Sequence, residues 1–330
     1  MILAGWRQIT NKGSQMKESF FPCALLWRFL MVFVGLVVPV SALAVSTPPQ
    51  VVASIKPVHA LVSAVMKGLG TPQLLVTNPA AAHHFALRPS QARMLQNAKL
   101  LVWIGPEMEL TLVDAVPPLA ADLSSLSLIK SKGLTLHRIE YDDEKEHDDH
   151  DGHKAHIEGD LNPHIWLNPD NVKLMLSEIA ARLAEIDPQN GSIYRANAMR
   201  AATGVDKAAT RLVAEMAPLM NKGFVVFHDA HIYFERYVGI RARTAITSDP
   251  DVPPRPRRLR AIRHMVEDRE IRCIFSEVGV SSKAVEVIAE GYDVRLDVLD
   301  PLGSQIAAEE DFFTALLTSY GDAFTRCLGP

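Results

Sequence analysis

Residues 192–220 read SIYRANAMRAATGVDKAATRLVAEMAPLM, a long stretch that is rich in alanine and has charged residues at intervals. It contains no proline before Pro218, and only Gly204 weakens the case for a helix. We therefore predict a single helix over residues 191–220. A helix of this length makes a stiff connection with limited opening, whereas a flexible linker would be rich in glycine and serine.

On both sides of this stretch, apolar runs of strand length alternate with helix-like segments. Such alternation predicts α/β layers with a mainly parallel sheet. We therefore expect two α/β lobes, each a mainly parallel sheet with helices, joined by one long rigid helix. The predicted strands are Val51–Ile55, Leu74–Val76, Leu100–Ile104, Phe224–Phe227, Cys273–Ser276 and Val294–Leu299; the predicted helices before residue 191 are Val58–Met66, Pro89–Asn97 and one that Asn168 caps and that ends near Ile186.

The N-terminal segment has the pattern of a secretory signal peptide. Phe29–Val40 reads FLMVFVGLVVPV, which is too short to span a bilayer comfortably. Lys17 and Arg28 precede this run, and the A-x-A pattern after it predicts cleavage behind Ala44. A retained membrane anchor is the alternative, and Met16 is an alternative start. The predicted division is a signal peptide at 1–44, an N-terminal lobe at 45–190 with a loop at about 142–158, a linker helix at 191–220 and a C-terminal lobe at 221–330.

Export determines how the cysteines are interpreted. After the predicted cleavage only Cys273 and Cys327 remain, an even pair in an oxidising compartment, so we predict a disulfide between them. Two buried free thiols are the alternative. The sequence has no C-x-x-C spacing, which argues against a zinc site built on cysteine.

The chain is acidic because of one segment. Its formal net charge is −4, and residues 140–160 alone hold ten acidic residues and two lysines. This distribution does not suggest a nucleic-acid partner. Within the segment, His147, His150, His153 and His156 lie in the run HDDHDGHKAH. Such a run offers nitrogen and oxygen donors for Zn²⁺, and less selectively for Ni²⁺ or Cu²⁺. The alternative is a solvated acidic loop with no metal.

Isolated polar residues at the ends of predicted strands form a second candidate metal site. His228 and Asp300 each follow a predicted strand, and His83 lies in the loop after another. His164 lies in a short piece, predicted to be extended, between Pro163 and the cap at Asn168. Because ligands bind beyond the carboxyl ends of strands in open α/β sheets, three histidines from both lobes could meet in the interlobe cleft. An aspartate or a water would complete the tetrahedron that zinc prefers.

Four segments together resemble a known family. HHFALRPSQARMLQNAKLLVWIGPEMEL, NPHIWLNPDN, GFVVFHDAHIYFERYVG and LDPLG are similar, in order and spacing, to the metal-binding solute receptors of ABC importers, called cluster A-I or cluster 9. The resemblance covers essentially the whole mature chain, including VVASIKPVHALVSAV and the cysteine pair. Within the family the chain is most similar to the ZnuA-type zinc receptors, because manganese receptors place a carboxylate where His228 stands, which suits a harder ion.

The resemblance implies that His83, His164 and His228 are the metal ligands. Asp300 matches the family's second-lobe carboxylate, which in zinc receptors can stay remote or give way to water. The sequence departs from the family pattern at two neighbouring positions. Ala82 stands where zinc receptors often have an acidic residue, and His84 stands where an acid is common, so His84 could substitute as a donor. The fourth coordination position therefore stays open.

The resemblance also implies the function. We expect a periplasmic, monomeric, non-enzymatic receptor that captures Zn²⁺ and delivers it to a membrane permease whose partner ATPase lies in the cytoplasm. The histidine-rich loop would then be an accessory zinc collector. The alternatives are a manganese or iron receptor of the same family, an adhesin-like surface protein, and a secreted zinc hydrolase. A hydrolase needs a general base beside the metal-bound water, and Glu277 is the candidate.

Overall fold

The computed structural model describes residues 47–78, 82–83, 85–119, 122–140, 160–307 and 311–330. Residues Ser46–Pro330 form one compact unit, and the description that follows concerns this unit. The predicted signal peptide lies outside the described residues. None of the described helices is both long enough and apolar enough to cross a membrane.

The first lobe is built on a parallel four-stranded sheet with the strand order β2-β1-β3-β4. Its inner strands β1 and β3 are almost wholly buried, as expected where helices cover both faces of a parallel sheet. The strands are β1 (Val51–Ala53), β2 (Gln73–Leu74), β3 (Leu100–Trp103) and β4 (Ser124–Ser127), and the helices between them are α1 (Lys56–Met66), α2 (Pro89–Asn97) and α3 (Leu110–Leu119).

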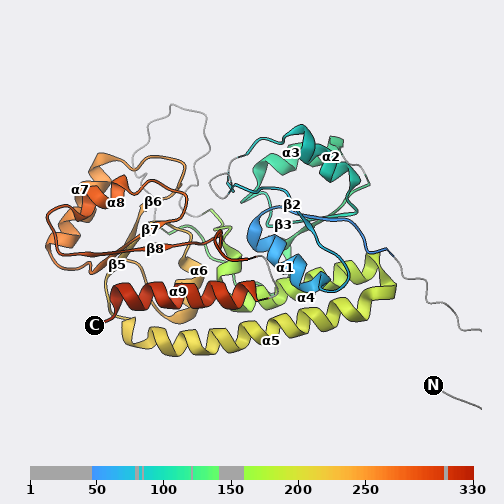
Figure 1. Cartoon of the computed structure of the whole chain (residues 1–330). Coiled ribbons are helices and arrows are strands. Elements are labelled where there is room, and N and C mark those ends of the chain that lie inside the picture. The colour runs from blue at the N-terminus through green and yellow to red at the C-terminus, as the bar shows by residue number, and fades with distance from the viewer. Residues whose placement is uncertain (1–46, 79–81, 84, 120–121, 141–159, 308–310) are drawn as a thin grey trace, which may run out of the picture. The chain divides into compact units, whose positions relative to one another are not determined.

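The second lobe repeats this arrangement, with the strand order β6-β5-β7-β8 and all strands parallel. Figure 1 shows this sheet on the left and the first sheet on the right. The strands are β5 (Phe224–His228), β6 (Thr244–Thr247), β7 (Cys273–Glu277) and β8 (Arg295–Leu299), and the helices between them are α6 (Ile232–Val238), α7 (Pro256–Glu267) and α8 (Lys283–Ala289). The predicted fold class is therefore confirmed.

The strand order decides where each lobe can bind a ligand. In both sheets the first and third strands in chain order lie side by side in the middle, and the chain leaves them in opposite directions. Ligands of doubly wound sheets bind at such a switch point, beyond the carboxyl ends of the two strands. In the second lobe these two ends are His228 and Glu277.

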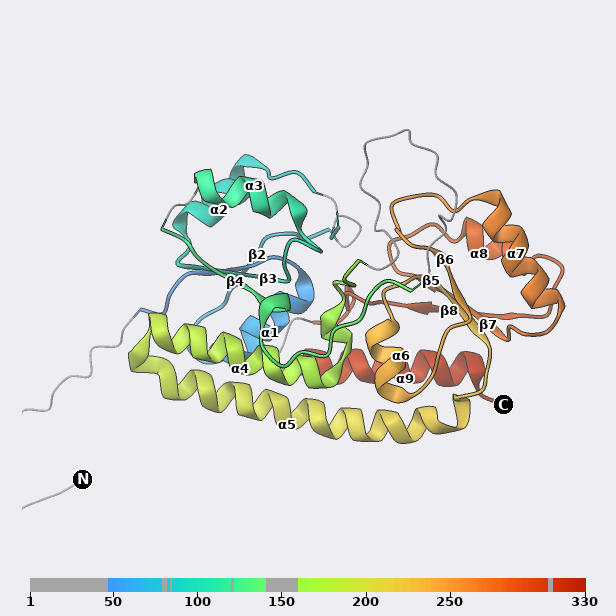
Figure 2. The same ribbon diagram turned by 180° about the vertical axis from the view of Figure 1, so that it is seen from behind.

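Three long helices form a layer beneath both sheets (Figures 1 and 2). They are α4 (Pro169–Ile186), α5 (Gly191–Met216) and α9 (Phe312–Leu328), with a 3-10 turn at Pro188–Asn190 between the first two. Helix α5 packs against α1 and α4 in the first lobe and against α9 in the second. One continuous apolar core extends from Val51 to Leu328, so both lobes share it.

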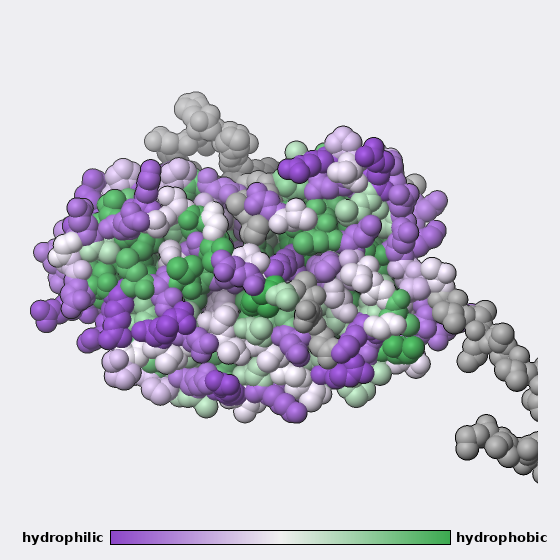
Figure 3. Space-filling view, in the orientation of Figure 1, coloured by the Kyte–Doolittle hydropathy of each residue, from purple (hydrophilic) through white to green (hydrophobic). Residues whose placement is uncertain are grey.

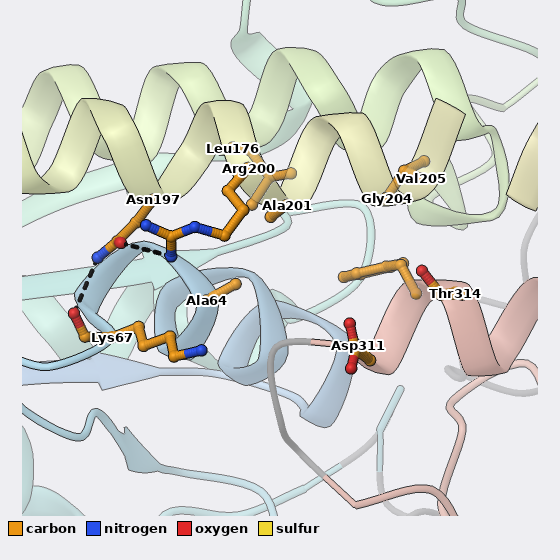
Figure 4. Close-up of a pocket in the computed structure, with 11 residues that line it drawn as sticks. Ala64, Lys67, Leu176, Asn197, Arg200, Ala201, Gly204, Val205, Asp311 and Thr314 are labelled. Carbon is orange, nitrogen blue, oxygen red and sulfur yellow. Dashed lines mark hydrogen bonds between the residues drawn. The ribbon is translucent and has the colours of Figure 1, made fainter. Parts of the chain in front are cut away.

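Asn197 of α5 attaches this helix to the first lobe. Its buried amide donates to the carbonyl oxygens of Val65 and Lys67 at 3.0 and 2.9 Å, and its Oδ1 accepts from Arg200 at 3.0 Å. Figure 4 shows Asn197 with Lys67 and Arg200 beside a cavity of about 60 Å³, at the place where α1, α5 and the beginning of α9 approach one another. The amide thereby satisfies carbonyl oxygens at the C-terminal end of α1, which the helix itself leaves without partners.

Helix α9 is tied to the second lobe covalently and by aromatic packing. Cys273 of β7 and Cys327 of α9 form the predicted disulfide, which is therefore confirmed. Beside it, the ring of Phe324 lies 5.2 Å from that of Phe224 and 4.5 Å from that of Phe275. The side of the sheet that faces α9 is thus closed by a rigid aromatic cluster.

Several local predictions are confirmed and others are wrong. Helix α2 has the predicted bounds, and Asn168 caps α4 by accepting from the backbone N–H groups of Asp170 and Asn171. The extended piece predicted around His164 is instead a 3-10 helix at Ile165–Leu167 that begins directly after it. Helix α5 ends at Met216 and continues as a 3-10 turn at Ala217–Leu219. The predicted lobe boundaries stay a prediction.

The outer edge of the second sheet carries apolar residues at the surface. Leu296 and Val298 of β8 are about half exposed, and so is Val287 of α8. Figure 3 shows an apolar area in the left half of the view, where β8 and α8 lie in Figure 1. Elsewhere on this face, hydrophilic residues and apolar ones are interspersed.

Candidate metal centre

Three isolated histidines meet between the lobes. His83 lies in the loop after β2, His164 directly precedes the 3-10 turn before α4, and His228 is the last residue of β5. One ring nitrogen of each lies within 4.8 Å of the others, so the group could hold a metal ion. His164 and His228 are 4% exposed, and His83 is half-buried.

The spacing of these nitrogens fits a tetrahedral ion. Two nitrogens that each lie about 2.0–2.1 Å from a tetrahedral zinc ion are separated by roughly 3.3 Å. The Nε2 atoms of His164 and His228 are 3.3 Å apart. The centre of the His83 ring lies 5.3 Å from that of His164 and 5.9 Å from that of His228, so His83 borders the same space as the other two rings.

A buried carboxylate orients His228. Oε1 of Glu277, at the end of β7, lies 2.6 Å from Nδ1 of His228 and 3.2 Å from its backbone nitrogen. An ionised carboxylate only accepts hydrogen bonds, so Nδ1 of His228 carries a proton, and in the neutral ring the lone pair of Nε2 faces the cleft. Burial disfavours the charged form of His228, but the Glu277 carboxylate outweighs this and raises the pKa of His228.

A second histidine holds the same carboxylate from behind. Nε2 of His231 donates to Oε1 of Glu277 at 3.2 Å, and Nδ1 of His231 accepts from the hydroxyl of Tyr320 on α9 at 3.0 Å. Burial alone would raise the pKa of Glu277, yet His228 and His231 hold it well below its ordinary value. Burial also lowers the pKa of His231, which keeps this imidazole neutral. The network thus presents one fixed tautomer of His228 to the cleft.

His164 is oriented in the same manner by a neutral group. Its Nδ1 lies 2.9 Å from Oδ1 of Asn162, and the amide of Asn162 donates to the backbone carbonyl of Asp229 in the second lobe. Since the amide oxygen is an acceptor, Nδ1 of His164 carries the proton and Nε2 faces Nε2 of His228. Asn162 therefore orients a histidine and joins the two lobes next to the cleft.

Comparison with known proteins identifies the family of the chain. The family model described as "Zinc-uptake complex component A periplasmic" (ZnuA) matches residues 51–325, which is most of the chain. The chain belongs to the ZnuA family.

Curated members of the ZnuA family match along almost their whole length. The High-affinity zinc uptake system protein ZnuA of Brucella abortus is 34% identical over 304 residues, covering 84% of this chain and 91% of the relative. The ZnuA of Paracoccus denitrificans is 36% identical over 303 residues, covering 85% and 92%. A solved structure, "Crystal structure of ZnuA", is 25% identical with a TM-score of 0.69, covering 84% of this chain and 99% of that one.

Asp300, the predicted carboxylate in this ZnuA-family chain, lines the cleft but lies outside the group of three histidines. Among the described residues, the cluster within 4.8 Å consists of His83, His164 and His228. Oδ2 of Asp300 accepts instead from the hydroxyl of Ser304 at 2.8 Å and from the backbone nitrogen of Gln305 at 3.2 Å. The cleft has a volume of about 250 Å³, and its lining includes Ala82, His83, Met108, His164, His228, Glu277 and Asp300.

The other predicted ligands cannot be placed. His84 lies outside the described residues, and so do His147, His150, His153 and His156 of the predicted accessory loop. Of the remaining histidines, His59 lies 3.0 Å from the carbonyl oxygen of Pro72, and His264 is exposed on α7. Neither lines the cleft.

The residues that orient the histidine ligands were not predicted as such from the sequence. Asn162 lies two residues before His164, and His231 lies three residues after His228, so both are close in sequence to a predicted ligand. Glu277 was predicted only as the base of a hypothetical hydrolase. Glu277 lies at the end of β7, the strand next to β5, and this position could have located it. That neighbourhood becomes known only when the strand order is known.

Proposed function

We propose that this ZnuA-family protein captures Zn²⁺ in the periplasm and delivers it to the permease of an ABC importer. His83, His164 and His228 are the proposed ligands, and a water or a further donor takes the fourth position. The ion is the cargo, so the protein performs no bond chemistry on it. The observation that carries the proposal is the meeting of three imidazole nitrogens, from two lobes, within 4.8 Å of one another, two of them at the 3.3 Å separation that a tetrahedral zinc ion requires.

The donor set favours zinc over manganese. Three neutral imidazoles suit Zn²⁺, whereas carboxylate and carbonyl oxygens suit Mn²⁺. The Glu277 carboxylate binds Nδ1 of His228 rather than the space between the histidines. Asp300 binds Ser304 and Gln305. The ion therefore meets nitrogen from three sides.

The same contacts argue against a zinc hydrolase. A hydrolase needs a general base beside the metal-bound water, and Glu277 was the candidate. This carboxylate already accepts hydrogen bonds from His228 and His231, and the two imidazoles hold it ionised as an acceptor for them. We therefore propose that the protein is not an enzyme.

Family membership supports the partner and the compartment. The family is that of the periplasmic component of a zinc-uptake complex, so we propose a membrane permease and its cytoplasmic ATPase as partners. Residues 1–44 are the proposed signal peptide. We propose further that His147, His150, His153 and His156 collect zinc near the cleft, and that the interlobe site is the one from which zinc is transported.

Zinc titration of alanine variants tests the three ligands. We expect the protein without residues 142–158 to bind one Zn²⁺ tightly in competition with a chelator. We expect His83→Ala, His164→Ala and His228→Ala, each in that background, to lose tight one-to-one binding. The matched control is His264→Ala, because His264 is exposed on α7 and does not line the cleft. Tight binding that survives the three cleft substitutions would refute the ligand assignment.

Two further measurements separate this function from its rivals. A deletion strain should lose growth under zinc chelation and regain it when the gene is restored. Zinc-dependent turnover of esters or peptides by the purified protein would instead support the hydrolase. Tight Mn²⁺ binding with weak Zn²⁺ binding would support the manganese receptor.

A further inference from the structure

The turn after β8 belongs to the second lobe but is held by the first. The indole nitrogen of Trp166 donates to the carbonyl oxygen of Pro301 at 2.7 Å, and the ammonium of Lys56 donates to the carbonyl oxygen of Ser304 at 2.7 Å. Trp166 lies in the 3-10 turn before α4 and is fully buried, and Lys56 is the first residue of α1. The segment 300–305 is therefore attached to the first lobe at two points.

Lys56 lies close enough to Asp300 for their charges to interact. Burial lowers the pKa of Lys56, and the negative charge of Asp300 acts in the opposite direction. The carboxylate of Asp300 is bound on Oδ2 by Ser304, the same residue whose carbonyl oxygen accepts from Lys56. The ammonium and the carboxylate are thus joined through a single residue.

The Asp300 turn separates two cavities that share a wall. One is the cleft with the three histidines, and the other is a cavity of about 180 Å³ lined by Lys56 and Ser304. Ala82 and Leu302 line both. Asp300 lines the first cavity together with the three histidines, while Lys56 and Ser304 line the second, and Oδ2 of Asp300 accepts from Ser304.

We propose that Lys56 is a positioning residue that determines the metal specificity of the site. By binding the Asp300 turn from the first lobe, Lys56 keeps the Asp300 carboxylate away from His83, His164 and His228. The ion then meets three neutral nitrogens, a set that favours Zn²⁺. Without Lys56, Asp300 turns toward the histidines and adds an anionic oxygen, which suits Mn²⁺ better. This inference rests on the proposed function of the three histidines.

Four variants and the wild type test the inference. In each protein Mn²⁺ and Zn²⁺ compete for the site, and the electron paramagnetic resonance signal of Mn²⁺ gives the ratio of the two affinities. Lys56→Met removes the charge and keeps the length of the side chain, and Lys56→Arg keeps the charge. We expect Lys56→Met to raise the affinity for Mn²⁺ relative to Zn²⁺ roughly tenfold to a hundredfold, the range in which groups around ligands change metal affinity. Lys56→Arg should keep the ratio of Mn²⁺ to Zn²⁺ affinity of the wild type, because it keeps the positive charge.

The remaining two variants show whether the effect passes through Asp300. Asp300→Asn alone should leave the ratio unchanged, and Lys56→Met with Asp300→Asn should return it to that of the wild type. Should Lys56→Met fail to fold, Lys56→Ala takes its place, because it also removes the ammonium group that binds Ser304 and attracts Asp300.

Two results would overturn the role of Lys56. One is an unchanged ratio of Mn²⁺ to Zn²⁺ affinity in the folded Lys56→Met or Lys56→Ala variant, and the other is a changed ratio that persists when Asp300→Asn is added. In both cases the wild type still binds zinc in the cleft, and His83→Ala still loses this binding. Failure of the proposed function is a different result, because the wild type itself would then bind no zinc in the cleft.

Discussion

At the scale of single residues, three buried glutamates show how partners decide the charge of a carboxylate. Burial raises the pKa of Glu109 to about 7 and that of Glu235 to about 8, although backbone N–H groups bind both. Glu277 is buried as well, yet its pKa is held well below the ordinary value by His228 and His231. The difference is the pair of imidazole N–H donors, which stabilise the ionised form. Glu277 is therefore the charged orienting group of the site.

Replacing Glu277 tests this role. In Glu277→Gln the amide oxygen can still accept from His228 and His231, but it carries no negative charge, so it holds the Nδ1 proton of His228 less strongly and makes Nε2 a weaker metal ligand. We expect zinc affinity to fall roughly tenfold to a hundredfold, as is usual when the partner of a ligating histidine is lost. Isothermal titration with zinc and a competing chelator measures it.

The control for this substitution is Glu267→Gln, because Glu267 is exposed at the end of α7. It should bind zinc like the wild type. Equal zinc affinity in Glu277→Gln and in the wild type would show that His228 needs no carboxylate to orient it.

At the scale of elements, α5 connects the two lobes, and one residue in its interior has a low helix propensity. Gly204 lies in the interior of this 26-residue helix. A methyl group at that position would meet the Thr314 hydroxyl at 3.5 Å, an ordinary contact. Gly303 differs, since its φ of +56° and two Phe312 ring atoms within 2.8 Å of a built Cβ leave no room for a side chain. Glycine is thus required in the turn and not in the helix.

Alanine substitutions at these two glycines should therefore have opposite effects. Gly204→Ala should raise the free energy of unfolding by up to about 1 kcal/mol, because alanine is the better helix former. Gly303→Ala should lower it, because the left-handed backbone and the Phe312 ring both oppose a Cβ. Urea unfolding measures the two changes side by side. A loss of stability in Gly204→Ala would mean that α5 packs more closely at this point than the structure describes.

At the scale of the whole molecule, the two lobes share a strand order and a helical layer, while the disulfide acts within the second lobe alone. It joins β7 to α9 across 54 residues of sequence. The three proposed histidine ligands all precede Cys273 in the chain, so none lies in the segment that the bond encloses. Stability and metal binding should therefore respond differently to loss of the disulfide.

The double substitution Cys273→Ala and Cys327→Ala separates these two effects. Loss of the cross-link should lower the free energy of unfolding by as much as about 4 kcal/mol on the chain-entropy estimate. At temperatures where the variant stays folded, zinc should still bind one-to-one. Urea unfolding and zinc titration of the variant and of the wild type test this. If the folded variant lost zinc binding, the position of His228 would depend on the disulfide through β7.

The elements that sequence predicted best are those with strong apolar or capping patterns. The strands around Val51, Leu100 and Phe224 and the helices after Arg88 and Asn168 are all present. Strand β4, with the sequence SSLS, and strand β6, with the sequence TAIT, were missed because most of their residues are not strongly apolar. Helix α3 was missed as well, since it contains Pro117 and Pro118. In these places packing against neighbouring elements decides the structure rather than local preference.

By itself the sequence determined the α/β class, the cysteine pair, the family resemblance and the residue types of the candidate metal site. These follow from local periodicity and from the position of polar residues at the ends of apolar runs. Only the tertiary structure decided that His83, His164 and His228 converge while Asp300 binds Ser304, and that Glu277 orients His228. The reason is physical: such distances depend on strand order and on contacts between the lobes, such as that of Lys56 with Ser304, which join residues far apart in the chain.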